Sequence, residues 1–357
     1  MFPAVAYTKS DNKMMKAEPF GILPDGQACT VYTITNSYGE YVQFLDYGAT
    51  IHKVGIADSE GMIENVVLSV QDLSTIQYAD RGAVIGRCAN QIRRGTYSAF
   101  GKEYHLEQNS RGHFLHGGSE NYANQLFSTT IEKGSITFRH RDKGMVGFGC
   151  EAEITVRYSF DDFHRLTMNI EMSADGDTIF NPTNHSYFNL DGHNSGTILK
   201  HYMEIYSGQI LEIGNDMIPT GRIIDISDTP FDFRKRKQIG KDIDADNPQM
   251  KIAGGYDHNY IFQNDRKLRK VAKLYGADSG IGMDVYSDLC GLQFYTGNFL
   301  NGQIGKDGAV YKKRSGVCFE TQFYPNSCNT SQFPSCILPA YKVFKSRTIY
   351  HFFTEYI

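Results

Sequence analysis

Long apolar runs are absent from this chain of 357 residues. None approaches the roughly 18 residues that a membrane-spanning helix requires, so we expect no membrane partner. The first twenty residues also lack an apolar core of the length found in signal peptides. The formal net charge is only −4, with 36 Lys and Arg against 40 Asp and Glu. A nearly balanced charge gives no reason to expect a nucleic-acid partner.

Cysteine motifs are missing as well. The seven cysteines are scattered, and no two form a Cys-x-x-Cys pair. The simplest interpretation is a reduced, cytoplasmic protein whose thiols are buried. The His and acidic residues lack the short ligand spacings of zinc sites, and the chain has no glycine-rich phosphate loop and no serine-hydrolase elbow. We therefore expect neither a metal nor a cofactor.

Tryptophan is absent and helical periodicity is weak, whereas 35 Gly, 23 Tyr and 23 Phe favour strands and turns. Apolar residues occupy every second position in "EAEITVRYSF" (151–160) and again in "RLTMNIEMS" (165–173), which predicts a half-buried antiparallel hairpin. One short helix is expected in "DLSTIQYAD", capped by Asp72, and the polar residues 234–249 are expected to be a surface excursion. No repeat or composition shift marks a boundary, so we predict one all-β, antiparallel domain over residues 1–357.

Residues 180–191, "FNPTNHSYFNLD", place polar side chains inside a predicted strand. In an extended chain, successive side chains point to opposite faces. Phe180, Phe188 and Leu190 would anchor the strand from one side. The other face would form the wall of a polar cleft and would carry Asn181, Thr183, His185, Tyr187 and Asn189. A lone His is more often structural than catalytic, but its polar neighbours on the same face favour a site.

Glu320 lies between Cys318 and Gln322 on one face of a second predicted strand, "SGVCFETQFYPN". A partly buried carboxylate is costly unless it is paired or used in chemistry, so a structural salt bridge and a catalytic role are both open.

Three further residues carry weaker signals: His116 beside two glycines, Asp257 in "GGYDHNYIF", and Tyr295 in "GLQFYTGNF". Turns, local hydrogen bonds or core packing account for each one taken singly. Together with His185 and Glu320 they would line one polar groove. Such a groove suits general acid–base chemistry on a polyhydroxylated substrate.

Several segments together resemble the aldose 1-epimerase (galactose mutarotase) family. They include "GRCANQIRRG", "NPTNHSYFNLDG", "GGYDHNYIF" and "SGVCFETQFYPNSCN", occur in the family's order, and extend the resemblance over about residues 19–350. The resemblance implies a large antiparallel β-sandwich, the galactose mutarotase-like supersandwich, with a concave sugar-binding cleft and few short helices. It also implies interconversion of the α and β anomers of a free aldose such as galactose or glucose.

The resemblance also implies roles for individual residues. His185 resembles the general acid that protonates the ring oxygen, and Glu320 matches the general base that takes the proton from the anomeric hydroxyl. The positions that match substrate contacts are Asn90, Gln91, His116, Tyr187, Asp257 and Tyr295, the last as an aromatic platform. One position departs from the family, because Gln91 stands where the family usually has Arg. If this segment is extended, Arg93 lies on the same face and is a candidate to supply the missing charge.

Other functions stay open at this point. A glycoside hydrolase would use Asp257 and Glu320 as its carboxylate pair. A non-catalytic sugar-binding protein could share the same fold. A hexose-phosphate epimerase would need a basic pocket, for which Arg93 and Arg94 are candidates. In each case the expected partner is a small sugar, and the chain is expected to be a monomer or a homodimer.

Overall fold

The computed structural model describes residues 8–10, 13–78 and 81–355 and consists almost entirely of antiparallel β-structure. The largest sheet has nine strands. In spatial order these are β13 (Ser128–Glu132), β14 (Ser135–Asp142), β15 (Ala152–Phe160), β16 (Arg165–Ala174), β32 (Val343–Thr354), β26 (Ile281–Ser287), β25 (Arg269–Tyr275), β20 (Tyr202–Ile205) and β23 (Lys237–Gln238). Strands β15 and β16 are the predicted hairpin, and their alternate residues are buried.

Two further sheets complete the main framework. The six-stranded sheet contains β1 (Thr8–Ser10), β2 (Lys13–Ile22), β3 (Ala28–Thr35), β4 (Tyr41–Leu45), β5 (Thr50–Ala57) and β6 (Ile63–Asn65). The seven-stranded sheet has the order β22 (Pro219–Asp225), β21 (Gln209–Ile213), β24 (Asp257–Ile261), β27 (Gly291–Tyr295), β30 (Val317–Gln322), β19 (Tyr187–Phe188) and β7 (Val67–Leu68).

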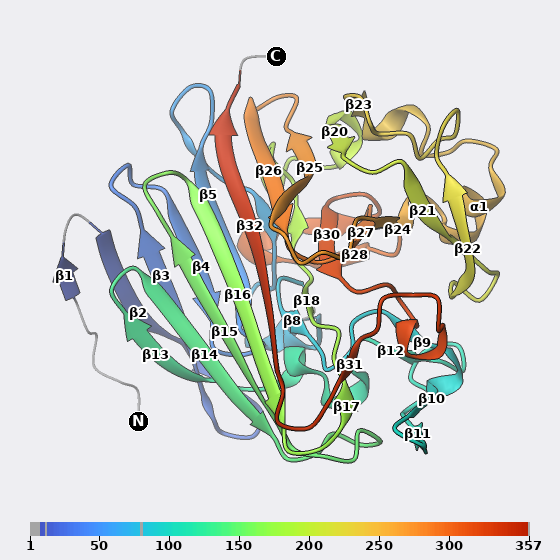
Figure 1. Cartoon of the computed structure of the whole chain (residues 1–357). Coiled ribbons are helices and arrows are strands. Elements are labelled where there is room, and N and C mark those ends of the chain that lie inside the picture. Colours follow the sequence, from blue (N-terminus) through green and yellow to red (C-terminus); the bar gives the residue numbers. More distant parts are fainter. Residues whose placement is uncertain (1–7, 11–12, 79–80, 356–357) are drawn as a thin grey trace.

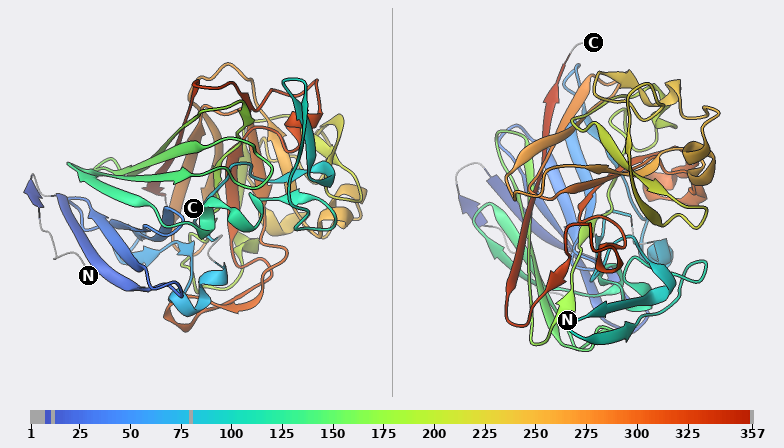
Figure 2. Two further views of the ribbon diagram at one scale, coloured as in Figure 1. Left: turned by 90° about the horizontal axis from the view of Figure 1, so that it is seen from below. Right: turned by 45° about the vertical axis from the view of Figure 1, so that its right-hand side comes forward.

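The nine-stranded sheet packs against both of the others. Phe44 of β4 stacks on Tyr158 of β15, with ring centroids 4.6 Å apart, and this contact joins the nine-stranded sheet to the six-stranded sheet. Phe188 of β19 contacts Tyr350 of β32, with ring centroids 5.0 Å apart, and this contact joins the nine-stranded sheet to the seven-stranded sheet. Figure 1 shows β14–β16 and β32 in front of β2–β5, and the two layers separate in the left view of Figure 2. One continuous hydrophobic core fills the space between them, so the predicted β-sandwich is confirmed.

Short paired segments carry the loops beside the seven-stranded sheet. They are β8 (Val84–Ile85) with β18 (Thr183–Asn184), β9 (Gln91–Ile92) with β12 (Phe114–Leu115), β10 (Thr96–Ala99) with β11 (Lys102–His105), β17 (Thr178–Ile179) with β31 (Ile337–Leu338), and β28 (Asn301–Ile304) with β29 (Val310–Lys312). Several of these segments lie to the right of β32 in Figure 1.

Helices are few and short, as predicted. Among the described residues the α-helix is α1 (Pro248–Ala253), where Asn247 caps Gln249 N at 2.9 Å. Residues 234–249 are exposed or half-buried except for Ile239 and Ile243, as expected of a surface excursion, and Asn-Pro at the end of this stretch starts the helix. The 3₁₀ turns are η1 (Leu73–Tyr78), η2 (Arg93–Gly95), η3 (Gly118–Glu120), η4 (Tyr122–Asn124), η5 (Ile198–Lys200), η6 (Ile239–Lys241), η7 (Lys306–Gly308) and η8 (Ser327–Asn329). Asp72 accepts a 2.8 Å hydrogen bond from Ser74 N, which caps η1 as predicted; residues 79 and 80 of that motif lie outside the described residues.

All seven cysteines are free thiols. In the part of the chain that the structure describes, the helices are too short and too polar for any of them to cross a membrane.

Candidate active site

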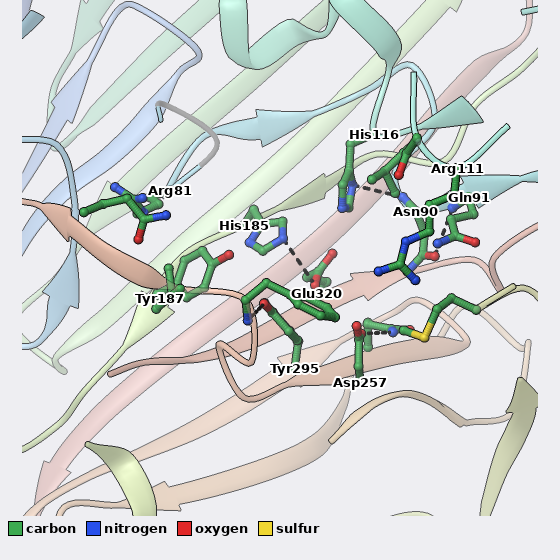
Figure 3. Close-up of a pocket in the computed structure, with 17 residues that line it drawn as sticks. Arg81, Asn90, Gln91, Arg111, His116, His185, Tyr187, Asp257, Tyr295 and Glu320 are labelled. Atoms are coloured by element: carbon green, nitrogen blue, oxygen red, sulfur yellow. Dashed lines mark hydrogen bonds and ion pairs between the residues drawn. The ribbon is translucent and has the colours of Figure 1, made fainter. Parts of the chain in front are cut away.

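A cavity of about 350 Å³ opens on one face of the seven-stranded sheet. Four adjacent strands supply its floor: Asp257 from β24, Gln293 and Tyr295 from β27, Glu320 from β30 and Tyr187 from β19. Period-two alternation puts these residues on the cavity face, whereas their neighbours Phe294 and Phe319 enter the core. All eight residues predicted from the sequence line this cavity: His185, Glu320, Asn90, Gln91, His116, Tyr187, Asp257 and Tyr295. Figure 3 shows how they converge.

His185 and Glu320 form the centre of the cavity. Nε2 of His185 lies 3.6 Å from Oε1 of Glu320, and the two residues are only 5% and 2% exposed. The backbone of His185 is fixed by hydrogen bonds of 2.9 Å to Ala83 O and from Gly82 N. Its Nδ1 faces Cys318 Sγ at 3.5 Å. An imidazole and a carboxylate are thereby held side by side, out of bulk water.

Two tyrosines fix the plane of the His185 ring. Tyr187 stacks on it with ring centroids 5.0 Å apart and an angle of 23° between the planes. Tyr295 meets it edge-on at 6.2 Å. The Tyr295 hydroxyl accepts a hydrogen bond of 3.0 Å from Phe299 N, and burial raises the pKa of Tyr295. Tyr295 therefore offers its ring rather than an ionised oxygen to a ligand.

His116 is held as a neutral hydrogen-bond donor. Its Nδ1 accepts a 3.1 Å hydrogen bond from Asn90 N. Burial, and next the neighbouring His185, lower the pKa of His116 to about 3. A neutral imidazole that accepts at Nδ1 carries its proton on Nε2. The remaining N–H of His116 is thus available for a ligand oxygen.

Asp257 is paired with Gln293, a residue that the sequence reasoning missed. Gln293 Nε2 donates to Asp257 Oδ1 at 2.6 Å. Burial raises the pKa of Asp257 to about 7; the Gln293 hydrogen bond opposes this shift, and the charge of Glu320 adds to it. Gln293 could have been found from the sequence, because it lies two positions before Tyr295 and so on the same strand face.

His116, His185 and Glu320 have potential ligand atoms within 4.8 Å of one another, which raises the question of a metal. The hydrogen bonding fits a metal poorly. A metal-bound His normally donates its second ring N–H to an acceptor, but Nδ1 of His116 accepts from a backbone N–H. Its Nε2 then carries a proton instead of the lone pair that a metal needs.

The expectation that the whole polar face of "NPTNHSYFNL" forms the cleft wall is wrong. The segment is broken into β18 and β19, and only His185 and Tyr187 reach the cavity. Asn181 Nδ2 donates to Phe323 O at 3.2 Å, and Asn189 Nδ2 donates to Ser315 O at 3.0 Å. These asparagines satisfy buried backbone groups that lie outside a regular ladder.

The prediction that Arg93 supplies the charge of the family's arginine is also wrong. Arg93 NH1 pairs with Asp216 Oδ2 at 2.8 Å and its side chain is 43% exposed; it does not line the cavity. Arg94 does not line it either, so these two residues provide no basic pocket for a phosphate. The guanidinium groups of the cavity instead come from Arg81 and Arg111, at opposite ends of Figure 3. No motif in the sequence singles out either residue.

Comparison with known proteins gives a consistent result. The aldose 1-epimerase family model matches residues 30–351. The chain is 36% identical to the galactose mutarotase of Homo sapiens, over 89% of this chain and 93% of that protein. It is 32% identical to the aldose 1-epimerase of Escherichia coli (strain K12), over 96% and 100%.

Solved structures agree with this assignment. A GalM/aldose epimerase homologue from C. elegans superposes with a TM-score of 0.83 and 26% identity, covering 91% of this chain and 98% of that one. A galactose 1-epimerase from Lactobacillus acidophilus NCFM gives a TM-score of 0.82 and 25% identity, covering 96% and 99%. The resemblance inferred from the motifs is therefore confirmed, and the chain belongs to the aldose 1-epimerase family, whose members are isomerases.

Proposed function

We propose that the protein interconverts the α and β anomers of free aldohexoses such as galactose and glucose, with His185 as general acid and Glu320 as general base. The observation that carries this proposal is the 3.6 Å separation of His185 Nε2 and Glu320 Oε1 inside a cavity. The ring oxygen and the anomeric hydroxyl of an aldose are attached to the same carbon. One acid and one base held this close can reach both oxygens of one bound sugar.

In this reaction the protein's catalytic groups need only transfer protons, and all other changes occur within the sugar. Glu320 removes the proton of the anomeric hydroxyl while His185 donates a proton to the ring oxygen. The bond from the anomeric carbon to the ring oxygen breaks, and an open-chain aldehyde forms. Rotation about the C1–C2 bond presents the other face of the carbonyl. Ring closure reverses both transfers and returns the enzyme to its starting state, so no co-reactant is consumed.

The remaining lining residues suit the binding of a polyhydroxylated ring. His116 offers an N–H donor, whereas Asp257 and the buried Oε1 of Gln293, which has no hydrogen-bond partner among the described residues, offer acceptors. Tyr187 and Tyr295 offer apolar ring surface. We assign substrate contacts to Asn90, Gln91, His116, Tyr187, Asp257, Gln293 and Tyr295. This mixture of fixed donors, acceptors and aromatic faces is typical of sugar sites.

We further propose that the protein works in a reducing compartment such as the cytoplasm, which its seven free thiols support. We also keep two predictions made from the sequence. The protein should have a small sugar as its partner and no nucleic acid, and it should be a monomer or a homodimer.

Polarimetry of freshly dissolved α-D-galactose and α-D-glucose tests the proposed function. Wild type should accelerate relaxation to the anomeric equilibrium, and His185→Ala and Glu320→Gln should each reduce this rate by about 10²-fold or more. Thermal unfolding of both variants checks that the fold is retained. An active His185→Ala variant would contradict the assigned acid. Product release from an aryl glycoside would instead indicate a hydrolase, and sugar binding without any acceleration would indicate a binding protein.

A further inference from the structure

We propose that Arg111 is a substrate-contact residue whose guanidinium holds sugar hydroxyls at the outer edge of the cavity, the role that Gln91 cannot fill with a neutral amide. This inference rests on the proposed function, because it assigns a specificity residue to the same site.

Arg111 is presented to the cavity by a tight turn. Ser110 and His113 exchange backbone hydrogen bonds of 3.0 and 2.8 Å, and the two residues between them are Arg111 and Gly112, with φ of +49° and +77°. Positive φ at both central positions is the geometry of a type I′ turn. Arginine is an unusual residue at such a position, since the left-handed region favours Gly, Asn and Asp.

The turn is anchored to the strand that carries Gln91. Leu115, four residues after Arg111, pairs directly with Gln91 between β12 and β9. The Asn109 side chain brackets the same segment, with hydrogen bonds of 2.8 Å from Leu115 N and 3.0 Å to Leu115 O. His113 Nδ1 accepts from Arg94 N at 2.9 Å. Arg111 is therefore positioned relative to Gln91 by a rigid framework.

The side chain of Arg111 is available for a ligand. It lines the cavity, is exposed, and makes no ion pair or hydrogen bond with any residue that the structure describes. Arg93, in the same region, is engaged by Asp216 and lies outside the cavity lining. In Figure 3, Arg111 is drawn together with Gln91 and Asn90 to the right of Glu320.

The chemistry of the site favours a cation here. Asp257, Glu320 and Gln293 supply acceptor oxygens on the floor of the cavity. Neighbouring hydroxyls of a sugar also need donors, and a guanidinium offers a planar fork of N–H groups that reaches two oxygens at once. A contact of this kind, remote from the anomeric carbon, stabilises the bound sugar and the transition state equally. It should therefore affect KM rather than kcat.

The test compares four variants by polarimetry with α-D-galactose. Arg111→Leu should raise KM about tenfold, the equivalent of one charged hydrogen bond, with kcat within about twofold of wild type. Arg111→Lys should recover part of the affinity, because it restores the charge without the fork. Arg93→Leu is the matched control and should leave both constants unchanged. In an Arg111→Leu background, Gln91→Arg should restore KM, an effect that a merely structural role of Arg111 would not produce.

Equilibrium binding of galactose, measured by calorimetry, separates this inference from the proposed function. If wild type binds galactose but does not accelerate its anomerisation, the proposed function fails while Arg111→Leu still tests the contact through Kd. Unchanged KM and Kd in Arg111→Leu would overturn the inference. So would a loss of affinity in Arg93→Leu equal to that in Arg111→Leu, or a wild type that binds no galactose at all.

Discussion

Gln293 donates a hydrogen bond of 2.6 Å to the Asp257 carboxylate and stands directly opposite Glu320 in the register of β27 and β30. One amide thus holds one carboxylate of the site and lies beside the other. The bond stabilises the charged form of Asp257, whose pKa is nevertheless raised to about 7 by burial.

Removing this donor should change the pH dependence of sugar binding. In Gln293→Leu the pKa of Asp257 should rise further above 7, by about 0.5–1 pH unit for the loss of one hydrogen bond. If ionised Asp257 accepts a sugar hydroxyl, the pH below which KM increases should move upward by the same amount. KM measured between pH 5.5 and 8.5 checks this. Gln303→Leu, which alters another cavity glutamine, should leave the midpoint in place.

The Asp257 carboxyl should also make the stability of the folded protein depend on pH. Its pKa is about 7 in the folded protein against 3.8 for an ordinary Asp, so between these values the folded state holds a proton that the unfolded chain has released. Its contribution to stability is present below pH 3.8 and is lost as the pH rises through 7. An Asn at position 257 does not titrate, so Asp257→Asn removes this loss. The Tm of the variant minus the Tm of wild type should therefore increase as the pH is raised from 4.5 to 7.5. A difference in Tm between the two proteins that does not change with pH would contradict the prediction.

The buried ion pair between Arg87 and Asp142 should be costly to break. Arg87 is fully buried, its Nε donates to Asp142 Oδ2 at 2.9 Å, and Tyr122 donates to the same oxygen at 2.7 Å. Arg87→Met leaves a buried carboxylate without its cation, which should cost about 3–5 kcal/mol in the free energy of unfolding. Urea denaturation measures this. The adjacent, exposed Arg141, which pairs with Glu151 at 2.7 Å, provides the control: Arg141→Met should cost less than about 1 kcal/mol.

Asn189 and His185 come from one sequence motif but should behave differently when mutated. Asn189 is fully buried; its amide donates to Ser315 O, and its oxygen accepts from Asp191 N at 3.2 Å. Asn189→Ala should therefore lower the free energy of unfolding by about 2–4 kcal/mol and leave kcat within twofold at a permissive temperature. His185→Ala should show the reverse pattern. Unfolding curves and polarimetry on both variants decide the matter, and a stable but inactive Asn189→Ala would refute this division of roles.

Much of this protein could be predicted from its sequence. Alternation in residues 152–174 indicates an antiparallel hairpin because a strand with one buried face must repeat every two residues. The motifs around His185, Asp257 and Glu320 indicate the family, and with it the β-sandwich and the residues that now line one cavity. These features depend on local pattern and on residue identity, both of which are written in the chain.

The tertiary structure alone decided which polar residues face that cavity. Asn181 and Asn189 turn to the backbone, Arg93 turns to Asp216, and Arg111 enters from a turn that no motif marks. Gln293 meets Asp257 across 36 positions of sequence, because β24 and β27 are neighbours. Periodicity tells which side chains share a face, but the partner that covers the face depends on sheet order and on loops distant in sequence. Those contacts are set by the packing of the whole chain, so no local pattern contains them.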